Sequence, residues 1–450
     1  MNKYIASKDF YKEVSAIAIP LAIQSVFTSC LGIVDTLMVS WIGMVSAVGT
    51  AAQIDSIANC VAFGAISGTG IFCAQFFGAK DGKKLKQSFG ISLVLATLIG
   101  LFFFAISAIF GESILKFYVD DPQVIKYGGM YLDIVKYSFL PSILSFAFSY
   151  VYRSIHKTKV PLIISIVSMA TNCILNYILI FGLWGFPELG VEGAAYATVF
   201  AQFLSLALHV GYALKTKQQF MGKFSELFSF DLHFIGSVMS RVSPFIMNEL
   251  LFGFGSTMFV KAFGALGTDA MDAYFVGTKI SDVFFFVIMG LSNANTVITG
   301  HTLGSGDLEK AKQQGNYFIG IGAALAIIMS IVIVIFAEPM VSLFKLQDPA
   351  VFESAVTIVR VFSIKISLRL FIVIVFGALR AGGDSKILTL LDSGLMWAVG
   401  IPLAFFAVHV LKIESISFVF LIIQLEQVIR MILGLIRYKS YKWAVNLTRI

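Results

Sequence analysis

The chain has 450 residues, of which 58% are hydrophobic and 13% charged, and its formal net charge is +7. An average soluble domain carries about 25% charged residues, so side chains this apolar cannot cover a water-soluble protein of this size. The excess of Lys and Arg needs no nucleic-acid partner, because anionic lipid at the cytoplasmic face of a membrane is a sufficient counterpart. The composition predicts an integral membrane protein.

Apolar stretches long enough to cross a hydrocarbon core of ~30 Å recur along the whole chain. The first half holds six of them, at 14–40, 52–77, 88–110, 131–152, 160–182 and 193–214. The second half holds six more, at 240–263, 273–300, 316–336, 355–379, 387–410 and 415–436. The expected fold is all-α, with about twelve transmembrane helices.

The longest connection between predicted spans divides the chain into two halves. It contains three lysines and the amphipathic run Phe224–Phe234, which is typical of a segment that lies along a membrane surface. We therefore expect an N-terminal six-helix lobe at 1–214, a cytoplasmic inter-lobe linker at 215–239 and a C-terminal six-helix lobe at 240–450.

Basic residues are concentrated on one side of the predicted bundle. If the N-terminus is cytoplasmic, the cytoplasmic connections and both termini hold most of the 33 Lys and Arg, among them Lys80, Lys83, Lys84, Lys86, Arg153, Lys157 and Lys159. The opposite side holds about five, which are Lys116, Lys126, Lys261, Lys345 and Lys412. This asymmetry follows the positive-inside rule. It predicts a multi-pass protein of the cell (plasma) membrane with both termini in the cytoplasm.

The two halves of the sequence resemble each other. Pro20 and Gly43 match Pro244 and Gly267 at one offset, and GAKDGKKLKQ from Gly78 matches GSGDLEKAKQ from Gly304 after two inserted residues. With the offset increased by one more residue, three further matches appear: DPQV with DPAV, Arg153 with Arg380, and Lys159 with Lys386. Six spans separate equivalent points, so the repeats are parallel and related by a pseudo-two-fold axis along the membrane normal. Such a plan suits alternating access in a transporter.

Several segments carry a resemblance to a known family. Pro20 followed fifteen residues later by Asp35, within VDTLMVSWIG, resembles the first helix of multidrug and toxic compound extrusion (MATE) transporters. The segments GTGIFCAQFFGAKDGKK, NCILNYILIFG, GVEGAAYATVFAQ and GALRAGGDSK resemble later parts of that family in the same order. The resemblance implies a secondary active transporter, not an enzyme, which exports small and often cationic or lipophilic compounds and is driven by Na⁺ or H⁺.

Asp35 is the first candidate functional residue. A charged side chain at the centre of a membrane helix costs at least ~2.5–3.5 kcal/mol, and the neighbours of Asp35 in the sequence are apolar. A carboxyl in this setting stays neutral unless protons or ions exchange onto it, which is the behaviour of a coupling site. The alternative is a carboxyl that only forms hydrogen bonds between helices.

Polar residues of two later spans complete the predicted coupling site. Asn172 and Asn176 are four residues apart, on one helical face. In the family that the sequence resembles, a sodium or proton site joins the aspartate to the positions of Asn172, Asn176, Thr198 and the main-chain carbonyl of Ala194. Such oxygen ligands suit Na⁺. Members of that family with an ion site often have Asp at the position of Asn176. With Asn there, Asp35 is the only carboxylate among the predicted ligands, so the coupling ion can be either Na⁺ or H⁺.

The second half holds a different set of charges inside its spans, and one of them is Asp392 in the eleventh. The predicted C-lobe polar cluster consists of Glu249, Lys279, Asp282, Lys365 and Arg369. Lys279 can pair with Asp282 on one helix face, and Glu249 with Lys365 or Arg369. The repeat mate of Asp35 is Phe259, so the lobes differ chemically. The cluster is either a structural ion-pair network or part of a substrate site.

Other functions are less favoured by the sequence. A flippase for lipid-linked saccharides shares the two-lobe plan, but we would expect a strongly cationic centre there, and the charges here are mixed. A membrane-embedded enzyme is disfavoured because no nucleophile, metal-ligand or phosphate-loop motif stands out. The expected partners are a small-molecule substrate and membrane lipid. We expect a monomer that needs no cofactor other than the coupling ion.

Overall fold

The computed structural model describes the backbone of residues 4–449 apart from 41, 43, 119–120, 230 and 344–348. Side chains at 26, 28–37, 40, 45, 268–269, 271–272, 275–276, 279, 282–283, 286 and 449 are also outside the description. Every regular element in the described part is helical, which confirms the predicted all-α class.

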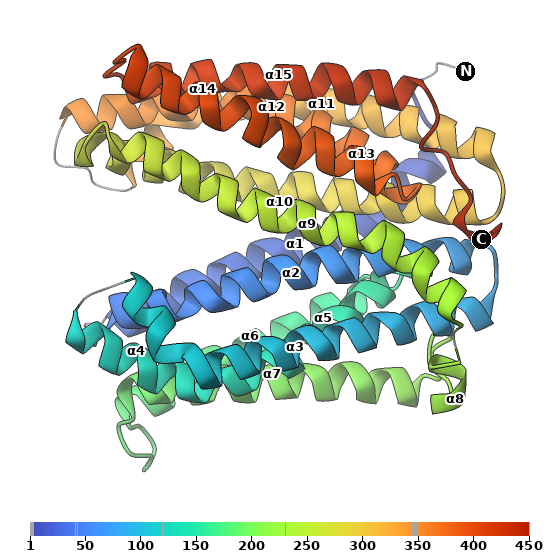
Figure 1. The fold of residues 1–450 in the computed structure, drawn as a ribbon, viewed down its shortest axis with the longest axis horizontal. Coiled ribbons are helices and arrows are strands. Elements are labelled where there is room, and N and C mark those ends of the chain that lie inside the picture. Colours follow the sequence, from blue (N-terminus) through green and yellow to red (C-terminus); the bar gives the residue numbers. More distant parts are fainter. Residues whose placement is uncertain are drawn as a thin grey trace. The chain divides into compact units, whose positions relative to one another are not determined.

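The first half contains nine of these helices (Figure 1). They are α1 (Lys8–Ser40), α2 (Val45–Gly78), α3 (Gly82–Tyr118), α4 (Pro122–Val135), the 3₁₀ turn η1 (Lys136–Ser138), α5 (Phe139–Ser154), α6 (Lys159–Phe181), α7 (Gly190–Lys215) and the short α8 (Phe224–Leu227). The predicted span at 131–152 therefore consists of the end of α4, the tighter turn η1 and most of α5.

The second half repeats this order with one irregular helix. It contains α9 (Leu232–Gly264), α10 (Thr268–Gly304), α11 (Leu308–Ser342), α12 (Pro349–Ala381), α13 (Ser385–Thr389), α14 (Ile401–Phe405), α15 (Ile416–Lys439) and the terminal 3₁₀ turn η5 (Leu447–Arg449). Three π-helical segments interrupt the eleventh predicted span: η2 (Leu390–Gly394), η3 (Met396–Gly400) and η4 (Phe406–Val410). Single π turns inside α-helices are frequent at functional sites.

The chain divides into two compact units, and each unit takes one piece from the other half of the sequence. One unit comprises Ile23–Ile246, and the other comprises Met1–Ala22 together with Met247–Ile450. Both divisions fall inside a helix, two residues after the internal prolines Pro20 of α1 and Pro244 of α9. A proline inside a helix removes one backbone hydrogen bond and is a common position for a bend.

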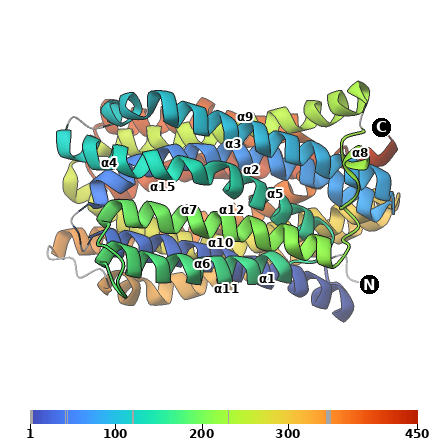
Figure 2. The same ribbon diagram turned by 90° about the horizontal axis from the view of Figure 1, so that it is seen from below.

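In the unit Ile23–Ile246, α2 packs against α3, α4 and α5, while α7 packs against α4, α5 and α6 (Figure 2). The start of α9 lies close to α2, since a Cβ atom on Gly64 would lie 2.6 Å from the Cα of Ile246. A Cβ on Gly68 would lie 3.0 Å from a methyl of Val242. The GxxxG spacing of these two glycines therefore serves close helix packing.

The other unit is built around α12, which packs against α10, α11 and α15. The start of α1 completes its core: Phe10 contacts the rings of Tyr317 and Phe318 edge to face, at centroid distances of 5.4 and 5.5 Å. Val14 and Leu21 are buried in the same cluster.

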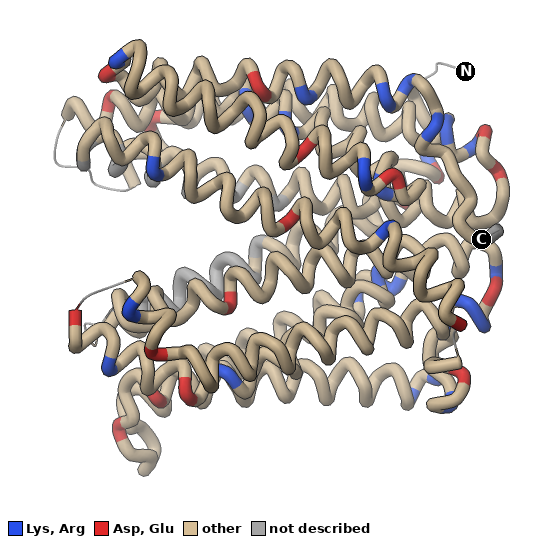
Figure 3. The backbone as a smooth tube through the Cα atoms, in the orientation of Figure 1, with Lys and Arg blue, Asp and Glu red and all other residues tan. Residues whose placement is uncertain are grey.

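Membrane-length helices occur in both halves of the described chain. Eight helical segments are apolar and long enough to cross a bilayer: Ser46–Gly78, Gly82–Tyr118, Pro122–Ser154, Lys159–Phe181, Gly190–Lys215, Leu308–Ser342, Ser385–Val410 and Ile416–Lys439. Within each unit, charged residues gather at helix ends, and the middle parts of the helices carry few (Figure 3). The few charges far from helix ends therefore need a specific explanation.

Candidate functional site

Four of the five residues predicted for the coupling site lie together on α6 and α7. The Asn176 side-chain amide donates to Asn172 Oδ1 at 3.2 Å, and the Asn172 amide donates to Thr198 Oγ1 at 3.4 Å. The Thr198 hydroxyl donates to the main-chain oxygen of Ala194 at 3.0 Å. Asn172 and Asn176 are 3% and 2% exposed. The four residues form one chain of polar groups at the interface of the two helices, in which Thr198 alone is partly exposed, and we call it the N-unit polar chain.

Asp35, the fifth predicted residue, has its side chain outside the described residues. Contacts on either side of it join α1 to the same helices. Gln24 donates to Ser165 Oγ at 2.8 Å and accepts from Arg153 at 3.0 Å. Further along α1, Val39 is buried in one cluster with Ile180 of α6 and Ala194 of α7. The stretch of α1 after Pro20 therefore follows α6 in the same direction.

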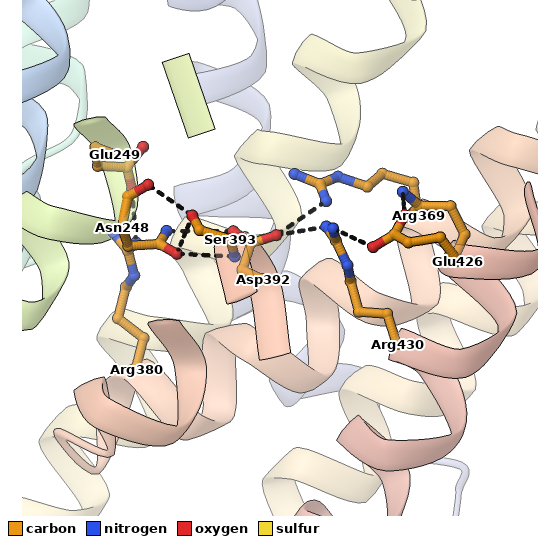
Figure 4. Close-up of polar contacts among 9 residues, drawn as sticks. Asn248, Glu249, Arg369, Arg380, Asp392, Ser393, Glu426 and Arg430 are labelled. Carbon is orange, nitrogen blue, oxygen red and sulfur yellow. Dashed lines mark hydrogen bonds and ion pairs between the residues drawn. The ribbon is translucent and has the colours of Figure 1, made fainter. Parts of the chain in front are cut away.

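A buried ionic network occupies the unit that contains α12 and α15 (Figure 4). Asp392 of the π segment η2 accepts from Arg430 at 2.5 Å and from Arg369 at 3.4 Å. Arg430 also forms a short ion pair with Glu426, one helical turn away on α15. The side chains of Arg430 and Glu426 are each only 1% exposed. Since buried ions require partners, the two acids and two arginines balance one another.

The same network reaches α9 through two uncharged residues (Figure 4). Asn248 donates its amide to Asp392 Oδ2 at 3.2 Å. The Ser393 hydroxyl donates toward Asn248, at 2.7 Å from its main-chain oxygen and 2.8 Å from Oδ1. Because η2 is π-helical, adjacent residues Asp392 and Ser393 both reach the same asparagine. The π segment η2 therefore connects α9 to the ionic network through these hydrogen bonds.

The described members of the predicted C-lobe polar cluster take part in separate contacts. Arg369 belongs to the ionic network and also lies over the rings of Phe252 and Phe285, 5.5 and 5.8 Å from their centroids. Glu249 was expected to pair with Lys365 or Arg369, but the described ion pair joins it to Arg380 at 3.1 Å. Arg380 lies in the last turn of α12, about three to four helical turns beyond Lys365 and Arg369 on the same helix.

Lys365 lies over two aromatic rings, 4.7 Å from the centroid of Phe362 and 5.1 Å from that of Phe420. A cation over a ring face is stabilised by the ring quadrupole. Lys279 and Asp282 belong to α10, but their side chains lie outside the described residues, so their predicted pairing stays a prediction.

Sequence reasoning missed four members of the ionic network and its extension: Asn248, Ser393, Glu426 and Arg430. One signal was present, since Glu426 and Arg430 are four residues apart within an otherwise apolar span and oppositely charged residues at this spacing pair on one helix face. The partners of Asn248 and Ser393 lie 144 and 145 positions away in the sequence, and no local pattern indicates them.

The two units keep equivalent polar contacts where the sequence repeats. Arg153 binds Gln24 in one unit, and its repeat mate Arg380 binds Glu249 in the other, at 3.0 and 3.1 Å. Gln24 in turn binds Ser165, and its repeat mate Asn248 binds Asp392. Each unit therefore fixes the helix that follows its internal proline with the same framework of contacts.

Two such repeated bundles of apolar, membrane-length helices, with polar networks buried at mid-helix, define a multi-pass membrane transporter. The MatE family model matches residues 20–178 and 244–406, and the two matched segments begin at the repeat-related prolines. The chain belongs to this family, whose members are transporters and not enzymes and need no cofactor.

Individual relatives agree with the family assignment. The chain is 26% identical over 415 residues to the probable multidrug resistance protein YoeA of Bacillus subtilis, covering 90% of this chain and 89% of that protein. It is 24% identical to a probable NorM multidrug resistance protein of Thermotoga maritima, covering 96% and 93%.

The fold is similar to a MATE crystal structure in a bent conformation, with a TM-score of 0.86, 18% identity and 96% of both chains covered. It is also similar to the Vibrio cholerae MATE transporter VcmN, with a TM-score of 0.89, 16% identity and 98% and 99% covered. The two-lobe plan of MATE transporters is thereby confirmed for this chain. These matches do not favour the flippase or enzyme alternatives.

Proposed function

We propose that this transporter is a cation-coupled antiporter, which exports small organic compounds, lipophilic or cationic, by alternating access. The coupling site is formed by Asp35 together with the N-unit polar chain (Asn172, Asn176, Ala194 and Thr198). The coupling ion is Na⁺ or H⁺.

The helix register of α1 against α6 carries this proposal. Gln24 meets Ser165, and Val39 shares a buried cluster with Ile180. Both pairs differ by the same number of positions, and the helices run in the same direction. Applied to Asp35, this register predicts a position level with Asn176. Eleven residues are close to three helical turns, so we expect Asp35 on the same helix face as Gln24, which contacts α6.

The internal repeat supports the same assignment. The repeat mate of Asp35 is Phe259, and the segment equivalent to the two asparagines, residues 399–405, contains only apolar residues and glycine. The equivalent positions are therefore all polar in the first half (Asp35 and the two asparagines) and all apolar in the second. A set of residues that serves one ion site would vary in this joint manner, whereas independent hydrogen bonds between helices would not.

The oxygen ligands of the proposed coupling site are compatible with both Na⁺ and H⁺. Amide, hydroxyl and main-chain oxygens are suitable ligands for a hard cation, and a single carboxylate suits either one Na⁺ or one H⁺. The test uses purified protein in proteoliposomes, with Na⁺ and proton gradients imposed separately and export of the organic cation ethidium followed by fluorescence. We expect Asp35→Asn to abolish gradient-driven export and leave the amount of folded protein unchanged.

Two further variants and a control sharpen this experiment. Thr198→Ala should reduce export less than Asp35→Asn, because water can replace one neutral oxygen. Asn176→Asp should strengthen any Na⁺ dependence by adding charge to the oxygen ligands. Asp133→Asn is the control, since Asp133 is 73% exposed and paired with Lys136 at 2.8 Å. Export by Asp35→Asn at wild-type rates under both gradients would rule out this coupling site.

We also propose a plasma-membrane protein with both termini in the cytoplasm, organised as six-helix lobes at 1–214 and 240–450 with a cytoplasmic linker at 215–239. The protein acts as a monomer within membrane lipid. Cysteines introduced at 80–86 should react with impermeant reagents only from the cytoplasm, and those at 116–118 only from outside. The reverse pattern would contradict this orientation.

A further inference from the structure

The exposed side of α2 differs in chemistry from the exposed sides of other membrane-length helices. Along Ser46–Gly78, every exposed residue that the structure describes is polar or small. The polar ones near the middle of the exposed side are Gln53, Asp55, Ser56 and Asn59. The other exposed positions are a serine, a glycine and an alanine, and the opposite side buries Ala51, Ile54 and Ala58 in the core.

Other helices expose large apolar side chains instead. On α3, Leu98 and Phe102 are 59% and 57% exposed, and on α11, Ile327 and Ile335 are 63% and 64% exposed. Faces of this kind suit contact with lipid tails. The exposed side of α2 has none of these large apolar residues among its described side chains, so it is built for contact with water.

Asp55 makes this conclusion stronger. It lies ten residues from the start of α2, about 15 Å along the helix axis at 1.5 Å per residue. An aspartate that faced lipid on a membrane helix is unfavourable, by on the order of 2.5–3.5 kcal/mol at the helix centre and by less toward its ends. The Asn59 amide donates to Asp55 Oδ2 at 2.8 Å, which fixes the carboxylate on the exposed side.

The charge of Asp55 is not neutralised within the described structure. No described Lys, Arg or His forms an ion pair with it, whereas Asp133, Asp384 and Asp392 all have basic partners. An unneutralised carboxylate on a water-filled surface inside a membrane attracts cations strongly, because nearby low-dielectric walls focus its field. Asn59 supplies a hydrogen-bonding neighbour, and Gln53 and Ser56 extend the polar surface.

We infer that Asp55 and Asn59 form a binding site for the cationic group of exported organic cations. This inference deepens the proposed function and rests on it, since it names the residues that bind the cationic group of the substrate. The site is separate from the N-unit polar chain: that chain lies between α6 and α7, and Asp55 is exposed on α2. Asp55 therefore contributes to substrate binding, and the ion-coupling reaction takes place elsewhere.

The first experiment tests whether this side of α2 contacts water. Single cysteines replace Asp55, Ser56 and Leu98 in turn, in a background in which the four native cysteines are alanine. A charged methanethiosulfonate reagent is applied to both sides of permeabilised membranes. The cysteines at 55 and 56 should react at least tenfold faster than the one at 98, which is also exposed but on an apolar face. Equal and slow reaction at all three would overturn the inference.

The second experiment measures substrate binding without any gradient. Binding of tetraphenylphosphonium, a permanent organic cation, to purified protein in lipid nanodiscs is measured by calorimetry. Asp55→Asn should raise the Kd at least tenfold, Asp55→Glu should keep it within about threefold of wild type, and Asp133→Asn should leave it unchanged. Size-exclusion profiles check that each variant is folded, and Asp55→Glu preserves the charge if the amide variant is unstable.

The outcomes separate this inference from the proposed function. An unchanged Kd in Asp55→Asn, or no binding by the wild type, would overturn the Asp55 site even if gradient-driven export is observed. Specific loss of binding in Asp55→Asn supports the site even if neither gradient drives transport, a result that would instead contradict the proposed antiport.

Discussion

The buried ionic network gives a sharp prediction about stability. Arg430 is the arginine that contacts both acids, Asp392 and Glu426. Arg430→Met keeps much of the side-chain volume and removes the charge. Asp392 then retains Arg369 at 3.4 Å, and Glu426 retains only the amide of Gln427 at 2.7 Å among its described partners. Glu426 would be left as a buried charge without an ion pair among its described contacts.

The expected magnitude follows from this geometry. Removing one partner of a buried ion pair costs about 3–5 kcal/mol, because the other charge stays desolvated. For a unit of 150–250 residues, each kcal/mol lowers the Tm by about 2–4 °C, so Arg430→Met should lower it by about 6–20 °C. Thermal unfolding of detergent-purified protein, followed by tryptophan fluorescence, measures this shift.

A double variant distinguishes this explanation from simple loss of packing. Glu426→Gln in the Arg430→Met background removes the unpaired acid, and Arg369 still balances Asp392. We therefore expect the double variant to regain at least half of the lost Tm, a coupling that a double-mutant cycle detects. A Tm for Arg430→Met within 2 °C of wild type, or no recovery in the double variant, would refute the proposed charge balance.

Three smaller predictions concern packing and the linker. Gly64→Val should destabilise the protein by about 1–3 kcal/mol in the same thermal assay, because its new Cβ would lie 2.6 Å from backbone of Ile246. Gly382→Ala should also lower the Tm, since the added Cβ would overlap the main-chain oxygen of Trp443, a buried residue near the end of the chain. The hydrogen bond from Lys86 holds the pKa of Glu226 below its usual value, so this contact is present at neutral pH and is lost as the pH falls through the lowered pKa. Glu226→Gln should increase tryptic cleavage of the linker at neutral pH by less than about fivefold, as expected for an exposed ion pair.

The fold was largely predictable because apolar length and helix periodicity are local properties. The helices extend beyond the predicted spans, however: the span at 88–110 lies within α3, which runs from Gly82 to Tyr118. Apolar residues mark the part of a helix that contacts lipid or core, and the polar turns at its ends remain helical. The π-helical segments of the eleventh span were not predicted. In the first of them, η2, Asp392 and Ser393 both contact Asn248, which lies 144 and 145 positions away in the sequence.

The candidate sites were predictable to different degrees for a similar reason. Asn172 and Asn176 show their shared face through their spacing, and the structure brings them together with Thr198. Glu249 instead pairs with Arg380, 131 positions away. Such a partner depends on which helices meet at which level, and the sequence spacing of charges does not contain that information.

The exchange of helix segments between the two units has a consequence for how the protein is made. The unit Ile23–Ile246 is complete once residue 246 has been synthesised, but the first 22 residues belong to the unit that ends at Ile450. At 5–20 residues per second, the rest of the chain takes roughly 10–40 s to appear. During that delay Phe10, Val14 and Leu21 lack the core that buries them in the finished protein. The beginning of the polypeptide is therefore among the last parts to reach its final packing, and the amino terminus must wait for a late step of assembly.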